Sequence, residues 1–303
     1  TYLDASVVIL LCLVALSGMT QTTQLASIQS LATAVVPVDK LSTAVSFMAF
    51  AQRSVSIIGA MLSGYLLFKA GSASVFLVAT IPLAAACGFF ATVPSTPVSH
   101  VQAASFWAAL QTGAGELARV PAVVQLLGLM ALAEIFGFAF NAFLPVLVSE
   151  SFDRGPASLG VLAGAASIGA MAGLGLLALF ASQLTNGRTL LLVVIAFGAM
   201  IMALAQSKAF AAGVVIVVGV GAAAALIDSL EWALLQASVR DALRGRVLGA
   251  WNVAIGMGWM GPIVVGAIAE YVGITRALTG AGFIVCIVGA GAFASGTLRR
   301  LTC

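Results

Sequence analysis

Charged residues are scarce in this chain. Only 8% of its 303 residues are Asp, Glu, Lys or Arg, whereas 62% are hydrophobic, and the mean hydropathy is +1.16. No water-soluble fold can bury this much apolar surface. The chain is therefore predicted to be an integral membrane protein. Its net charge of +3 gives no indication of a nucleic-acid partner.

Residues that bind metals or perform catalysis are also sparse. His100 is the only histidine, and the four cysteines lack the paired spacing of a disulfide framework or a zinc site. No Gly-Lys-Ser/Thr loop is present, which argues against an ATP-driven pump. No nucleophile, base and orienting acid occur in a plausible arrangement. We therefore expect no metal, no cofactor and no enzymatic activity.

Long apolar segments, by contrast, fill most of the chain. A spanning helix needs about 20 mainly apolar residues, and nine such segments fit between the Gly, Pro and charge clusters. They cover 5–31, 41–68, 73–93, 120–148, 157–183, 188–206, 209–236, 245–271 and 275–298. Transmembrane strands would instead give segments of about ten alternating residues. The predicted fold class is all-α, a polytopic helical bundle in a membrane.

The distribution of Lys and Arg predicts the orientation, because cytoplasmic loops carry the excess of these residues. With the C-terminus in the cytoplasm, the inside ends hold Lys40, Arg119, Arg188, Arg240, Arg244, Arg246, Arg299 and Arg300. The outside ends then hold Lys69, Arg154, Lys208 and Arg276. We expect a cytoplasmic C-terminus. The odd number of segments, the first residue Thr1 and the lack of a basic leader suggest that an N-terminal part is missing.

An internal repeat relates the two ends of the chain. A shift of about 202 positions places Asp39-Lys40-Leu41 on Asp241-Ala242-Leu243, and it superposes three glycines of each copy. These pairs are Gly59 with Gly261, Gly64 with Gly266, and Gly71 with Gly273. The shift spans six of the predicted helices. The repeat therefore indicates two six-helix halves in parallel orientation, of which this chain supplies the last nine helices.

These features resemble the major facilitator superfamily, whose two six-helix bundles flank a central substrate cavity. The resemblance rests on Arg244-Gly245-Arg246-Val247, continuing to Gly261-Pro262 and Gly266, and on the weaker copy around Asp39-Lys40-Leu41. Within this superfamily, the Arg-Gly-Arg-Val stretch is most similar to the drug and siderophore exporter branch, which includes enterobactin-exporter-like and macrolide-efflux-like permeases. One departure is the loop 183–188, which lacks the Asp of the family's charged signature.

The resemblance implies three parts: the rest of an N-terminal bundle at 1–93, a cytoplasmic linker at 94–119 and a C-terminal bundle at 120–303. It implies a monomeric bacterial inner-membrane transporter that exports a small amphipathic molecule by alternating access, with protons as the coupling ion. One alternative is a lipid or lysophospholipid flippase of the same fold. Another is a non-transporting membrane remnant or scaffold.

Ionisable groups inside apolar helices are the best candidates for function, because each costs several kcal/mol there unless it is paired or hydrated. Glu134 lies near the middle of segment 120–148, and Asp228 and Glu231 lie three residues apart on one face of segment 209–236. The resemblance places these acids on cavity-lining helices, so we expect a proton-coupling or cation site. For Glu231, an alternative is that it reaches water at the cytoplasmic end.

Other residues have supporting roles in this hypothesis. Asn141 and Gln24 are candidates to line the cavity, and Arg53 is expected to pair with an acid and hold helices together. Phe136, Phe138, Phe140 and Phe143 are candidates to cradle an apolar substrate, or else face lipid. The packing and gating positions are predicted to be Gly59, Gly64, Gly261, Pro262 and Gly266. Arg244 and Arg246 belong to the predicted cytoplasmic loop.

Overall fold

The computed structural model describes residues 73–92, 119–239 and 243–301, together with the single residues 16, 51, 55, 59, 62, 66, 69 and 115. Within these ranges, the side chains of residues 244–246 and 248 lie outside the description. The chain divides into two compact units, Thr1–Val101 and Gln102–Cys303. The division falls inside the linker predicted at 94–119.

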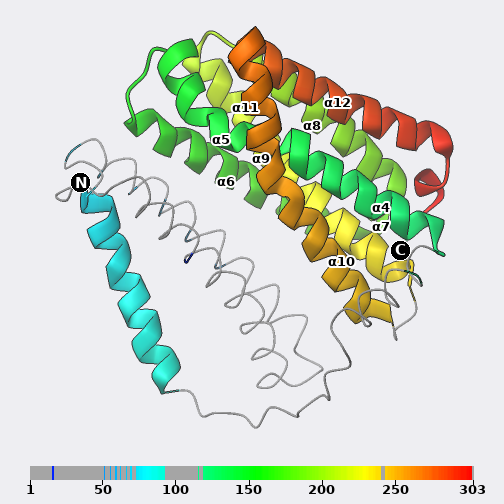
Figure 1. Cartoon of the computed structure of the whole chain (residues 1–303). Coiled ribbons are helices and arrows are strands. Elements are labelled where there is room, and N and C mark those ends of the chain that lie inside the picture. The colour runs from blue at the N-terminus through cyan, green and yellow to red at the C-terminus, as the bar shows by residue number, and fades with distance from the viewer. Residues whose placement is uncertain are drawn as a thin grey trace. The chain divides into compact units, whose positions relative to one another are not determined.

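The N-terminal unit contributes one continuous described helix, Ala73–Ala91, drawn in cyan in Figure 1. It is long and apolar enough to cross a membrane, and it matches the segment predicted at 73–93. Its apolar side chains, such as Phe76 and Leu83, are exposed in the structure. The segments predicted at 5–31 and 41–68 lie outside the described residues, apart from single helical positions such as Leu16 and Gly59.

The C-terminal unit is built from helices, and the described residues contain no β-strand longer than an isolated bridge. Counting the helix at Ala73–Ala91, seven described helices are long and apolar enough to span a membrane. The six in this unit are Pro121–Ser151, Ala157–Leu179, Gly187–Gln206, Phe210–Ala237, Gly249–Val272 and Ile274–Ser295. They match the last six predicted segments. The all-α class is therefore confirmed.

The first of these helices is not a regular α-helix. It consists of α4 (Pro121–Leu132), the π-helical turn η2 (Ala133–Gly137), α5 (Phe140–Val146) and a second π-helical turn η3 (Leu147–Ser151). A π turn admits one more residue than an α turn, so it widens the helix locally. Pro145 lies inside α5 and cannot donate the hydrogen bond that its position would require. The segment was predicted as one uninterrupted helix.

The segment predicted at 245–271 is also broken. It contains α10 (Arg244–Gly256), a short 3-10 turn η5 (Met257–Trp259) and α11 (Met260–Val272). Pro262 lies in the first turn of α11, where a missing N–H is tolerated. In an unbroken helix its N–H would bond the carbonyl of Gly258. The lack of this bond fits the short 3-10 turn that separates α10 from α11.

Two helix pairs approach each other closely through glycine. In the pair α6 (Ala157–Leu179) and α9 (Phe210–Ala237), the Cβ position of Gly221 is filled by the carbonyl oxygen of Ala166. In the pair α8 (Gly187–Gln206) and α12 (Ile274–Ser295), Gly198 and Gly282 each lie against the other's carbonyl oxygen. Small residues permit such contacts, and packing rather than hydrophobicity drives helix association in lipid.

The end of the unit that carries the C-terminus is tied together by backbone contacts. After α6, the chain turns at Phe180, forms the short helix α7 (Ala181–Leu184) and enters α8, whose first amide groups are capped by Asn186. The 3-10 turn η6 (Leu298–Arg300) follows α12 beyond Gly296, which has a φ of 77°. Leu298 is fully buried, and Gly187 donates its N–H to the carbonyl of Leu301 over 2.9 Å.

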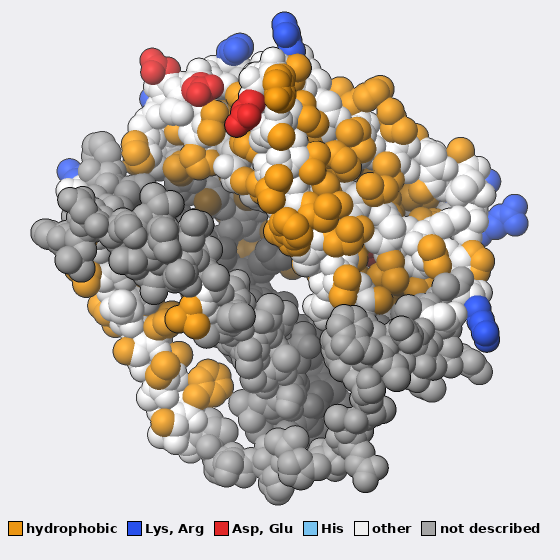
Figure 2. All heavy atoms as spheres, in the orientation of Figure 1, with side chains coloured by type: hydrophobic (Ala, Val, Ile, Leu, Met, Phe, Trp, Pro, Cys, Tyr) orange, Lys and Arg blue, Asp and Glu red, His pale blue; other side chains and the backbone are white. Residues whose placement is uncertain are grey.

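The surface of the C-terminal unit is apolar along its length. Figure 2 shows hydrophobic side chains between two ends at which the charged side chains gather. Fully buried residues, such as Phe197, Leu230 and Leu234, fill the interior, whereas Leu179, Val215 and Tyr271 are largely exposed. An apolar outer surface that stays exposed fits a surrounding of lipid.

Candidate functional site

Glu134 lies in the π-helical turn η2, near the middle of the first spanning helix of the C-terminal unit. Its neighbours Ala133, Ile135 and Gly137 are buried, and Glu134 itself is half-buried. The turn is held by the N–H of Phe138, which donates to the carbonyl of Ala133 over 2.9 Å. Single π turns are frequent at functional sites because they re-aim side chains and free backbone groups.

Asp228 and Glu231 lie on α9 and share one helix face, as their spacing predicts. The structure brings both acids to Glu134. Asp228 interacts electrostatically with Glu134, and Glu231 interacts with both of the other carboxyl groups. The acids predicted on two separate segments thus lie within electrostatic reach of one another, and they are called the acid cluster below.

Glu231 is the most deeply placed member of the cluster. It is 0% exposed, so the alternative that it reaches water at the cytoplasmic end is wrong. The backbone N–H of Met130 on α4 interacts with it. Even so, neither carboxylate oxygen has a partner that meets hydrogen-bond geometry among the described residues. A carboxyl group this deep in an apolar helix bundle is costly unless it finds polar partners.

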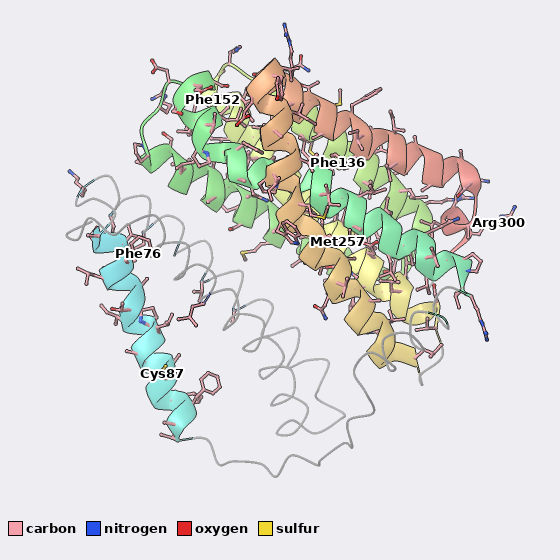
Figure 3. The ribbon with its side chains drawn as sticks, viewed as in Figure 1. Phe76, Cys87, Phe136, Phe152, Met257 and Arg300 are labelled. Atoms are coloured by element: carbon pink, nitrogen blue, oxygen red, sulfur yellow. The ribbon has the colours of Figure 1, made fainter. Side chains whose placement is uncertain are left out.

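The break between α10 and α11 packs directly on the π turn that carries Glu134. A methyl group added at Gly258 would lie 2.8 Å from Oε2 of Glu134. At Gly261 the Cβ position is taken by the carbonyl oxygen of Ile135. Figure 3 labels Phe136 in η2 and Met257 in η5, which mark the two turns within the bundle. Glu134 thus lies beside the α10–α11 break, within electrostatic reach of the acids on α9.

A comparison with protein families accounts for this architecture. The model of the Major Facilitator Superfamily matches residues 2–262, which is most of the chain. The chain belongs to the major facilitator superfamily. Membership makes it a multi-pass membrane transporter, with a small-molecule substrate and the lipid bilayer as its surroundings. No curated protein gives a significant match.

Two further residues of this major facilitator chain were predicted to pack or gate helices, and they lie on the same helix as Gly261. Gly266 faces Phe143 of α5, whose ring Cζ would be 3.6 Å from an added methyl group. Pro262 is half-buried in the first turn of α11. Gly258, Gly261 and Gly266 therefore all face the first spanning helix of the unit, from Glu134 to Phe143.

Among the remaining predicted site residues, Asn141 is described in full and does not contact the acid cluster. Asn141 is exposed on α5, and its side-chain amide donates to the carbonyl of Phe138 over 3.2 Å. Gln24, Arg53 and Gly64 lie outside the described residues, and Gly59 is described only as an exposed helical residue. Arg244 and Arg246 begin α10, with side chains beyond the description. In the described part of the chain, no three His, Cys, Asp or Glu residues are placed to hold a metal ion.

The phenylalanines that follow Glu134 mostly build the core. The Phe138 and Phe140 rings pack against Phe197 of α8, with ring centroids 5.2 and 6.4 Å away. Phe140 is buried, and Gly137 gives room to the Phe197 ring. Their alternate spacing could not show which of them face inward, and the structure assigns these two to helix packing.

Two features of the site escaped the sequence reasoning. Gly258 lies in a glycine-rich part of the sequence, but nothing in the sequence shows that it faces Glu134. Trp232 and Trp251 pack together with ring centroids 5.0 Å apart, joining α9 to α10 beside Glu231. Trp251 Nε1 is buried and has no hydrogen-bond partner among the described residues. A tryptophan next to Glu231 in the sequence was the available signal.

Proposed function

We propose that this major facilitator is a proton-coupled exporter of a small amphipathic molecule, of the drug or siderophore class, that works by alternating access. The observation that carries the proposal is the cluster of Glu134, Asp228 and Glu231, which joins two spanning helices. In the C-terminal bundle, Lys and Arg enter a spanning helix only in its first turn, at Arg188 and Arg276. Glu134 therefore has no basic residue along its own spanning helix.

The proposed mechanism assigns the coupling proton to Glu134. Among the three acids, Glu231 is fully buried, whereas Glu134 and Asp228 are half-buried. One side of a half-buried carboxyl group can contact water, while its opposite side interacts with the remaining two acids. Glu134 also lies where the π turn meets the α10–α11 break. Whether Glu134 carries a proton can therefore bias how these helices pack. In the proposal, the proton competes with the substrate for this site.

The proposed orientation of the protein in its membrane follows from the distribution of charged residues. Arg188, Arg299 and Arg300 gather at the end where Gly187 bonds Leu301. Arg154 lies at the other end, with its guanidinium 5.6 Å from the centre of the Phe210 ring. Figure 3 shows Phe152 and Arg300 at opposite ends of the bundle. The basic excess supports a cytoplasmic C-terminus, and the proposal places the protein as a monomer in a bacterial inner membrane.

The first test is the substitution Glu134→Gln, which removes the proton-binding group and keeps the size of the side chain. The protein is expressed from its native open reading frame, and everted vesicles are screened with amphipathic dyes and siderophores for transport driven by a pH gradient. We expect Glu134→Gln to abolish this transport, with a loss of at least about 100-fold, in the range of removed acid–base groups. Membrane expression is expected to be unchanged.

The matched control is Glu150→Gln. Glu150 lies on the same spanning helix, in η3, and is exposed near the helix end. We expect this variant to transport as the wild type does. Full proton-driven transport in Glu134→Gln would remove Glu134 from the mechanism, and a wild-type protein that transports no probe of either class would contradict proton-coupled export.

A further inference from the structure

Two breaks in regular α-helix meet in the C-terminal unit. The π turn η2 widens the first spanning helix, and the 3-10 turn η5 tightens the helix that contains α10 and α11. The two turns pack against each other. Because Pro262 has no N–H, the Gly258 carbonyl lacks the helical donor that an unbroken helix would supply. Gly258 thus lies at the point where the regular α-helical hydrogen bonds of this helix are interrupted.

The carboxyl group of Glu134 fills the space beside Gly258. A methyl group at position 258 would lie 2.8 Å from Oε2, 3.7 Å from Cβ and 3.8 Å from Cδ of Glu134. One turn later, the Cβ position of Gly261 is occupied by the backbone of Ile135. The two contacts differ in kind. At Gly261 the obstacle is fixed backbone, whereas at Gly258 it is the movable end of an ionisable side chain.

No other described charged group separates Glu134 from Gly258. The acids facing Glu134 are Asp228 and Glu231, both on α9. Elements α4, α8, α11, α12 and η5 pack on η2, and their titratable residues are Arg188, Glu270, Tyr271, Arg276 and Cys286. The first four lie at helix ends, and the thiol of Cys286 bonds the carbonyl of Ile195 over 3.3 Å.

Building on the proposed coupling role of Glu134, we propose that Gly258 is a positioning residue for this carboxyl group. The carboxyl group packs on the α10–α11 break, and it thereby links proton binding to the position of α11. Any sliding or rotation of the helix at Gly258 changes the space that is available to the carboxyl group of Glu134. Linkage is reciprocal. A proton that binds Glu134 alters the packing of the break, and a change at the break alters the proton affinity of Glu134.

The test uses Gly258→Ala, with Gly256→Ala as its matched control. Gly256 lies two residues earlier and is exposed, with open space where its Cβ would be. In Gly258→Ala the flexible end of Glu134 can move aside, so the fold is expected to survive. The readout is the infrared C=O band of protonated carboxyl groups, titrated with pH in the purified protein, and Glu134→Gln identifies the part of the band that belongs to Glu134.

We expect Gly258→Ala to change the proton affinity of Glu134 by at least about threefold, which is a shift of about half a pH unit in its titration midpoint. Gly256→Ala is expected to leave the midpoint unchanged. This readout does not depend on knowing the substrate. If the titration midpoint of Glu134 is the same in Gly258→Ala as in Gly256→Ala, the proposed role of Gly258 is overturned.

A second pair of variants separates contact with the carboxyl group from general helix packing. Glu134→Asp shortens the side chain by one methylene and vacates the space beside position 258. In this background we expect Gly258→Ala to have little further effect, because the two changes share one contact. An equal shift in both backgrounds would show that the added methyl acts through packing and would overturn the proposal. The proposed function has a separate test, because it fails if the Glu134→Gln variant retains proton-driven transport.

Discussion

Glycines in this protein differ in what fills the place of the missing side chain. On α12, an added methyl at Gly282 would lie 2.6 Å from the carbonyl oxygen of Gly198 and 2.8 Å from Cγ of Met202. Gly280, two residues earlier, is exposed and has open space at that place. Both glycines read alike in the sequence, yet only Gly282 sets the distance between α8 and α12.

We therefore expect Gly282→Ala to destabilise the protein and Gly280→Ala to leave its stability unchanged or slightly increased. The added methyl of Gly282→Ala meets fixed backbone, and such overpacking costs about 1–3 kcal/mol. At Gly280 the methyl meets nothing, and Ala is the better helix former. Thermal unfolding of the two variants in the same detergent measures the difference. Equal midpoints would contradict the close α8–α12 contact.

The acids and the glycines show how far single residues can be interpreted from sequence. Glu134, Asp228 and Glu231 were identifiable because a charge inside an apolar segment is costly and therefore informative. That they lie within reach of one another depends on how α9 packs against α4, and no spacing along the chain contains this information. Gly258 gave no signal at all, because a glycine in a helix does not reveal which side chain it faces.

At the scale of elements, the positions of the spanning helices were predictable and their regularity was not. Segment length and hydropathy gave the described spans to within a few residues, because the bilayer fixes the length of a helix. The π turn η2 and the 3-10 turn η5 replace α turns over only a few residues, so the apolar pattern barely changes. Pro145 and Pro262 were the local signals for irregular helix.

The short turn η6 has a larger structural role than its length suggests. It follows α12 and packs against both α8 and α4, with Leu298 at 0% exposure. The Leu298 carbonyl fills the Cβ position of Gly187, in the loop that lacks the family's charged signature. In this unit, backbone contacts with the C-terminal segment therefore hold the start of α8.

For this element we expect Leu298→Ala to destabilise the protein and to loosen the first turn of α8. Replacing a buried leucine with alanine costs about 2–5 kcal/mol, whereas Arg300→Ala at an exposed position of the same turn should stay within about 0.5 kcal/mol. Thermal unfolding gives the overall loss, and hydrogen exchange at residues 187–191 locates it. Unchanged exchange there in Leu298→Ala would show that η6 does not hold α8.

At the scale of the whole molecule, the charged side chains of the described C-terminal unit gather at its two ends. Hydrophobic side chains cover the length of the C-terminal unit and charged ones lie at its two ends (Figure 2). Contacts within the unit assign Arg188 and Arg300 to one end, and Arg154, over Phe210, to the other. The basic excess at the first end was already visible in the sequence, because loop charge needs no knowledge of packing.

This distribution predicts the topology directly. We expect green fluorescent protein fused to the C-terminus to fluoresce, since it matures in the cytoplasm. Alkaline phosphatase, which folds outside the cytoplasm, should be active when inserted after Arg154 and inactive when inserted after Asn186. The turn at 152–156 suits an insertion because Asp153, Arg154 and Gly155 are exposed. The opposite pattern of reporter activity would invert the orientation, so that the acid cluster would have to load its protons from the other side of the membrane.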